Sequence, residues 1–160
     1  MGAGKTTLGK SLALVLELPF VDLDELLVQT EGRSIPEIFK QDGEPYFRDL
    51  ESRILQRTLD FEAVIATGGG IVGREENCVF LKTHGTVIYV YADVQTQFQR
   101  TKNDTNRPML SNDDRFARLT DLFSKRDPLY RKISTIIIDS SKGTVHECVQ
   151  MLQNSLAKVG

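Results

Sequence analysis

MGAGKTTL, residues 1–8, is the stretch that decides the fold of this chain. Against the phosphate-loop pattern G-x-x-x-x-G-K-[ST], it supplies the closing Gly4, Lys5 and Thr6, whereas the opening glycine would fall before residue 1. A glycine-rich turn points backbone N–H groups at phosphate oxygens, and the following helix presents its positive end there. Lys5 would reach the outer phosphates and Thr6 would bind magnesium. The alternative is an ordinary helix start, and an isolated G-K-T match does not decide between the two.

Length and composition indicate one ordinary globular domain. The chain has 160 residues, 40% of them apolar and 26% charged, and its net charge of −2 gives no broad footprint for nucleic acid. Cys78 and Cys148 lie far apart without metal-ligand spacing, so we expect reduced, structural thiols. No apolar run is long enough for a membrane span, and because no charged segment precedes an apolar stretch at the start, we expect no secretory leader. We expect a cytosolic protein, a monomer, that binds neither nucleic acid nor membrane.

Short apolar strands alternate with helical segments along the chain. The patterns predict strands at 20–21, 63–66, 86–91 and 135–138, and helices at 5–17, from 24, from 34, and at 44–59, 75–82, 94–102, 115–126 and 145–159. Such alternation favours an α/β fold, a parallel sheet with helices on both faces and ligands at the carboxyl ends of the strands. Residues 102–114 interrupt the pattern with a long polar loop, which predicts a functional or mobile segment.

Two acidic residues and a run of glycines follow predicted strands. Asp22 and Asp24 flank Leu23, and strand alternation would place both carboxylates on one side, near the phosphates. One could hold a magnesium-bound water while the other takes a proton, although Asp24 could simply cap the next helix. Gly68, Gly69 and Gly70 come directly after an apolar strand, and three successive glycines favour a close approach of backbone to a ligand.

Four arginines stand where anions would need them. Arg107 lies in the polar loop, where its guanidinium could close over phosphate charge. Arg48 could instead be a solvated helix residue paired with Glu51, and Arg100 and Arg126 near helix ends could serve only the helix dipole. The residue types suit phosphoryl transfer to a small acceptor that carries a carboxylate, with arginine forks on that carboxylate and Asp24 as base.

Six segments in order carry a resemblance to a known family. They are G-A-G-K-T-T, F-V-D-L-D, G-E-P-Y-F-R-D-L-E, A-T-G-G-G, R-P-M-L and K-R-D-P-L-Y, and together they resemble shikimate kinase from end to end. The resemblance implies a nucleoside-monophosphate-kinase-like fold with a five-stranded parallel sheet. It also implies ATP and magnesium as cosubstrates, and phosphorylation of the 3-hydroxyl of shikimate.

The resemblance also implies a role for each matching position. The phosphate loop corresponds to Gly2, Ala3, Gly4, Lys5, Thr6 and Thr7, the magnesium-site acid to Asp22, and the substrate-binding base to Asp24. The acceptor's carboxylate would be bound by Arg48 and Arg126, and the acceptor would contact Gly68, Gly69 and Gly70. Arg107 matches the lid arginine and Arg100 the adenine-stacking arginine, so residues 1–160 are expected to form a single kinase domain with a mobile lid around 102–114.

The chain departs from the family pattern at two places. Residues 139–144 (D-S-S-K-G-T) lack the asparagine and proline usual in the family's adenine loop. The strand that delivers the family's phosphate loop, in the middle of its sheet, has no counterpart before Gly2. We therefore expect the natural reading frame to begin upstream, the 160 residues alone to be unstable or inactive, and a version extended upstream to be a working kinase. The alternatives to a shikimate kinase are a related small-molecule kinase, such as a gluconate kinase, and a catalytically silent nucleotide-binding module.

Overall fold

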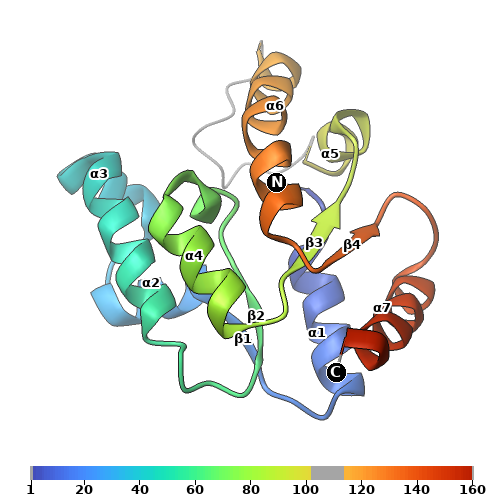
Figure 1. Cartoon of the computed structure of the whole chain (residues 1–160). Coiled ribbons are helices and arrows are strands. Elements are labelled where there is room, and N and C mark those ends of the chain that lie inside the picture. Colours follow the sequence, from blue (N-terminus) through green and yellow to red (C-terminus); the bar gives the residue numbers. More distant parts are fainter. Residues whose placement is uncertain (1, 102–113, 160) are drawn as a thin grey trace.

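A computed structural model describes residues 2–101 and 114–159 of the chain (Figure 1). Helices and short strands alternate along it. The elements in order are α1 (Lys5–Val15), β1 (Phe20–Asp22), α2 (Leu23–Glu31), α3 (Ile35–Gln56), β2 (Val64–Ala66), the 3-10 helix η1 (Ile71–Gly73), α4 (Glu75–His84), β3 (Ile88–Tyr91), α5 (Val94–Thr101), α6 (Arg115–Ile133), β4 (Ile136–Asp139) and α7 (Val145–Val159).

The strands of the described residues form two separate parallel pairs. β1 pairs with β2, with Phe20 opposite Val64 and Asp22 opposite Ala66. β3 pairs with β4, with Ile88 opposite Ile136. The α/β class and the parallel pairing predicted from the sequence are confirmed. The two sheets, however, share no strand: the order is β1-β2 in one and β3-β4 in the other.

Two clusters of apolar side chains hold the helices on these sheets. One lies where α2, α3, η1 and the end of α6 meet, and contains Leu27, Ile38 and Ile54 at an exposure of 1% or less. The other joins α1, β4 and α7 through residues such as Leu12 and Leu152. In Figure 1, α1 and α7 lie side by side below β3 and β4, and α2, α3 and α4 lie to the left of β1 and β2.

Local signals explain most of the helix boundaries. Ser34 caps α3 with a complete capping box, because its hydroxyl accepts from the N–H of Glu37 and the Glu37 carboxylate accepts from the N–H of Ser34. Gly43 breaks the helical geometry inside α3 with φ 81°. The break expected from the sequence at Gly43 is present as a kink, after which the second helical part begins at once.

Two expectations about α2 and α6 are wrong. Asp24 does not cap α2: the cap is Asp22, whose Oδ1 accepts from the N–H groups of Asp24 at 2.9 Å and Glu25 at 3.4 Å. The strand therefore ends at Asp22, and Asp24 lies in the first turn of a helix. Helix α6 does not end near Arg126 but runs through Pro128 to Ile133, because Tyr130 and Ile133 pack against the first apolar cluster.

Within the described ranges, no helix is both long and apolar enough to cross a membrane. Of the two cysteines, Cys148 is buried, Cys78 is half-buried, and both are free thiols.

Candidate functional site

The phosphate loop, residues 2–7, turns sharply at two glycines. Gly2 has φ 68° and Gly4 has φ 83°, conformations that favour glycine. A Cβ on Gly2 would also lie 2.9 Å from the carbonyl oxygen of Gln97 and 2.9 Å from a methyl of Thr101. Lys5 then begins α1, so the first amide groups of the helix face the same turn. The close backbone approach and the helix start fit a phosphate cradle.

Arg100 ties this loop to the segment that follows β4. Its Nη1 donates to the carbonyl oxygen of Gly2 at 3.3 Å and to Ser140 Oγ at 3.0 Å, and its Nη2 donates to the Ser140 carbonyl at 2.7 Å. Ser140 Oγ in turn donates to the carbonyl oxygen of Ala3 at 2.7 Å. Arg100 thus sits beside the phosphate loop, where its contact with an adenine stays a prediction, and Ser140 is a structural partner that the sequence did not reveal.

Thr6 and Asp22 bring hard oxygen ligands together next to the phosphate loop. Thr6 Oγ1 lies 3.4 Å from Asp22 Oδ2, while Asp22 Oδ1 is held by the start of α2. A hydroxyl and one carboxylate are what Mg²⁺ takes from a protein when phosphates and waters fill its other positions. In the described ranges, no group of three or more His, Cys, Asp and Glu side chains could hold a metal ion.

The glycine loop, residues 67–70, follows β2, and each of its three glycines leaves room for charged side chains. A Cβ on Gly68 would lie 2.6 Å from Glu51 Oε1 and 3.2 Å from Asp24 Oδ1. A Cβ on Gly69 would lie 3.2 Å from Arg126 Nη1.

The third glycine, Gly70, faces Arg48. A Cβ there would lie 2.7 Å from Arg48 Cζ. Three successive glycines are needed because two carboxylates and two guanidinium groups press against this short piece of backbone.

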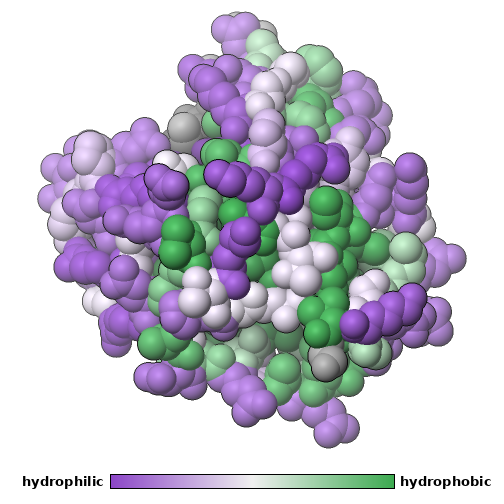
Figure 2. Space-filling model, viewed as in Figure 1, coloured by the Kyte–Doolittle hydropathy of each residue, from purple (hydrophilic) through white to green (hydrophobic). Residues whose placement is uncertain are grey.

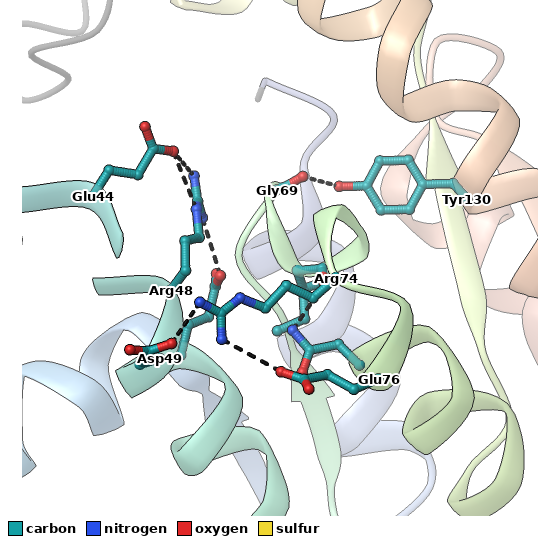
Figure 3. Close-up of polar contacts among 10 residues, drawn as sticks. Glu44, Arg48, Asp49, Gly69, Arg74, Glu76 and Tyr130 are labelled. Atoms are coloured by element: carbon teal, nitrogen blue, oxygen red, sulfur yellow. Dashed lines mark hydrogen bonds and ion pairs between the residues drawn. The ribbon is translucent and has the colours of Figure 1, made fainter. Parts of the chain in front are cut away.

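Arg48 is held between Glu44 and Glu51, and Figure 3 shows its contact with Glu44. Its Nε and Nη2 donate to Glu44 Oε1 at 3.2 and 2.9 Å, and its Nη1 donates to Glu51 Oε2 at 3.0 Å. Glu51 is only 3% exposed, whereas Glu44 is 53% exposed. The sequence offered Glu51 as an ordinary surface partner of Arg48, but it is a buried member of the cluster.

Burial raises the pKa of Glu51. The pairing with Arg48 lowers the same pKa in part, and the nearby Asp24 carboxylate raises it again. The cause is the loss of hydration of a charged carboxylate, which the single ion pair offsets incompletely.

Tyr130 links α6 to the glycine loop. Its hydroxyl donates a short hydrogen bond to the carbonyl oxygen of Gly69, which Figure 3 shows reaching across from α6. The Tyr130 ring stacks on Tyr89 of β3 with centroids 4.8 Å apart, and the Tyr89 hydroxyl donates to Asp127 Oδ1 at 2.9 Å. Burial raises the pKa of Tyr130 to about 12, so the hydroxyl stays a donor. Tyr130 ends the K-R-D-P-L-Y segment, in which the sequence alone gives its hydroxyl no partner.

The structure therefore brings most of the predicted site residues to one edge of the sheets. Lys5, Thr6 and Thr7 lie on the first turn of α1, and Asp24, Arg48 and Arg126 meet at the glycine loop. Strand alternation does not align Asp22 with Asp24, because Asp24 is already helical. Arg107 and the expected lid fall outside the described residues.

The comparisons with known proteins agree on one family. The family model described as shikimate kinase matches residues 1–157. A shikimate kinase of Ralstonia nicotianae is 43% identical over the whole chain and 85% of its own length, and one of Acinetobacter baylyi is 42% identical over the whole chain and 89% of its own.

Solved structures give the same result. A shikimate kinase from Acinetobacter baumannii in complex with shikimate superposes with a TM-score of 0.92 at 41% identity, over 99% of this chain and 89% of that one. A shikimate kinase from Bacteroides thetaiotaomicron superposes with a TM-score of 0.91 at 32% identity, over 98% of this chain and 94% of that one. With the phosphate loop and the arginine-lined glycine loop at one edge of the same fold, the chain belongs to the shikimate kinase family.

Proposed function

We propose that this chain transfers the γ-phosphoryl group of ATP to the 3-hydroxyl of shikimate. The observation that carries the proposal is the spacing of Asp22 and Asp24. Asp22 lies against Thr6 beside the phosphate loop, and Asp24, two residues on, lies against Gly68 beside Arg48 and Arg126. A donor site and an acceptor site are thereby adjacent.

The acceptor side suits a small hydroxylated carboxylate. Two guanidinium groups at Gly69 and Gly70 offer forks that match a carboxylate, and charge-assisted bonds of this kind are about twice as strong as neutral ones. Asp24 would accept the proton of the hydroxyl whose oxygen attacks the γ-phosphorus, while the bond to the β-phosphate breaks and ADP leaves. The buried Glu51 keeps Arg48 aimed at this place.

The donor side suits ATP with magnesium. The glycine turns of residues 2–4 and the start of α1 would bind the phosphates, and Lys5 would neutralise the outer ones. Thr6 and Asp22 would hold a magnesium ion, which neutralises phosphate charge when bound. A closing lid at 102–114 with Arg107, a cytoplasmic location and a monomeric state stay predictions from the sequence.

A coupled assay of ADP release tests the acceptor. We expect turnover with shikimate and none with gluconate or without an acceptor. Turnover with gluconate would indicate a related small-molecule kinase. ATP binding without turnover on either acceptor would indicate a silent nucleotide-binding module.

Asp24→Asn tests the base. We expect the variant to lose roughly 10²- to 10⁴-fold in kcat, because the general base is gone, and to bind ATP as before. Asp121→Asn is the control, since Asp121 is an exposed partner of Lys125 on α6. A variant at position 24 that keeps most of its kcat would remove Asp24 from this role.

A further inference from the structure

Two carbonyl groups of the phosphate loop are held by side chains from elsewhere in the fold. Arg100 Nη1, from α5, donates to the carbonyl oxygen of Gly2 at 3.3 Å. Ser140 Oγ, from the segment after β4, donates to the carbonyl oxygen of Ala3 at 2.7 Å. The next carbonyl oxygen, that of Gly4, accepts from the main-chain N–H four residues on, in the first turn of α1. Each of three consecutive carbonyl groups thus has a fixed partner.

Peptide geometry turns these carbonyl contacts into a direction for the amides. All peptide bonds of the described residues are trans, and in a planar trans peptide the C=O and the N–H of the following residue point in opposite directions. A held Gly2 carbonyl therefore fixes where the N–H of Ala3 points, and a held Ala3 carbonyl fixes the N–H of Gly4. With the N–H of Lys5 at the start of α1, three consecutive amides face away from their loop's anchors and toward the expected phosphates.

The position of Ser140 is set by the β3–β4 pair. It follows directly after Asp139, the last residue of β4, and its N–H donates to the carbonyl oxygen of Tyr91 at 2.9 Å. Its carbonyl oxygen accepts from Arg100 Nη2 at 2.7 Å, and its Oγ accepts from Arg100 Nη1 at 3.0 Å. Because a hydroxyl donates one hydrogen bond and accepts others, Ser140 serves Ala3 and Arg100 at the same time.

Hydrogen bonds, rather than apolar packing, hold the segment after β4. Its residues 140–144, S-S-K-G-T, are polar or glycine, and residues 142–144 are exposed. Figure 2 shows mainly hydrophilic residues on the right of the molecule, where Figure 1 places this segment. With little packing to replace it, the contact between Ser140 and Ala3 depends on the hydroxyl.

We propose that Ser140 is a positioning residue for the phosphates of the nucleotide: its hydroxyl holds the Ala3 carbonyl and thereby aims the N–H of Gly4 at a phosphate oxygen. The inference rests on the nucleotide binding of the proposed function and extends it to a residue outside the phosphate loop. Ser140 acts through the loop backbone and does not touch the ligand itself. What it favours is therefore the polyphosphate chain, whichever base that chain carries.

A second route from Ser140 to the nucleotide would run through Arg100. The family resemblance implies that Arg100 stacks on adenine, and Ser140 accepts a hydrogen bond from the same guanidinium. Loss of the Ser140 hydroxyl by this route would weaken the binding of the base alone. Inorganic tripolyphosphate separates the two routes, because it has the phosphates and no base.

Calorimetric titration of the full chain with ATP and with tripolyphosphate, both with magnesium, tests the proposal. In Ser140→Ala we expect both Kd values to rise by the same factor, roughly tenfold, as for the loss of one hydrogen bond to a charged group. Ser140→Thr keeps the hydroxyl and should bind both ligands as the parent does. Ser141→Ala is the matched control, because the Ser141 hydroxyl donates to Asp139 Oδ1.

An Arg100→Ala background gives a second test of the direct contact. The N–H of Ser140 still bonds to Tyr91 there, so Ser140→Ala should weaken tripolyphosphate binding by the same factor as in the parent. The amide proton of Gly4 gives a spectroscopic readout. Its NMR shift on tripolyphosphate binding should be smaller in Ser140→Ala than in the parent or in Ser140→Thr.

The inference would be overturned by a loss of ATP affinity that spares tripolyphosphate, by a Ser140→Thr variant as weak as Ser140→Ala, or by a loss that disappears without Arg100. A parent chain that binds neither ligand would overturn it together with the proposed function. No acceptor is present in these titrations. A parent that binds both ligands but does not turn over shikimate would therefore contradict only the proposed function.

Discussion

Gly70→Ala isolates the contact between the glycine loop and Arg48. Gly70 has φ −95° and ψ 0°, a conformation that alanine adopts without strain, so the change adds only a methyl group. That methyl would lie 2.7 Å from Arg48 Cζ and 2.8 Å from its Nη2. Ordinary carbon contacts are about 3.5–4.0 Å, so the guanidinium must move by roughly 1 Å.

The expected loss follows from that displacement. A misplacement of about 1 Å at a substrate-positioning group costs on the order of 100-fold, or about 2.7 kcal/mol of transition-state stabilisation. We expect this loss in kcat/KM for shikimate, mostly through a raised KM for shikimate, while KM for ATP stays unchanged. The assay is steady-state ADP release, with one substrate varied and the other saturating.

Two controls separate this cause from general damage. Gly73→Ala adds the same methyl three residues later, where nothing lies within 4 Å, and should behave as the parent. In an Arg48→Ala background, Gly70→Ala should have little further effect, because the group that it displaces is gone. Full activity of a folded Gly70→Ala variant, or additive losses in the double variant, would refute the reasoning.

Three further changes probe the same cluster. Tyr130→Phe should raise KM for shikimate and leave KM for ATP unchanged, since the half-buried Gly69 carbonyl loses its donor at a cost of about 0.5–1.5 kcal/mol; equal KM values in the variant and the parent would contradict this. Glu44→Gln should lower KM for shikimate up to about fivefold, because Glu44 occupies the Nε and Nη2 fork of Arg48 through an exposed pair; a raised KM would show that Glu44 positions Arg48 instead. Glu51→Gln should gain stability relative to the parent as the pH rises above 4.5. The raised pKa of Glu51 favours the folded parent only while the carboxyl is protonated, and that contribution is lost as the pH rises through the folded-state pKa, so urea unfolding at pH 5, 6 and 7 should show a growing difference.

The sequence predicted helix boundaries well where a capping residue or a glycine marks the helix start. Ser34 with Glu37, and the glycines of the phosphate loop, mark helix starts that the structure has. The sequence could not show that α6 passes through Pro128. A proline normally ends a helix, and only the packing of Tyr130 and Ile133 in the first apolar cluster makes continuation favourable.

The sequence predicted which charged residues form the site, but it did not predict whether each of them is buried or exposed. Arg48 and Glu51 are three residues apart on a helix, a spacing that predicts an ion pair wherever the helix lies. Whether such a pair is a surface feature or a buried one depends on what packs above it. Here the glycine loop, whose Gly68 lies 17 residues after Glu51 in the chain, packs above the pair. That packing depends on the tertiary fold and cannot be seen in the local sequence.

The position of the glycine loop depends on both β2 and β3. β2 ends at Ala66 and leads directly to the glycine loop, so the position of Gly68 and Gly70 depends on where β2 is held. β3 carries Tyr89, whose ring stacks on Tyr130, the residue that holds Gly69. The glycine loop is therefore supported from both strand pairs, by the chain that leaves β2 and by the stacked Tyr89 and Tyr130.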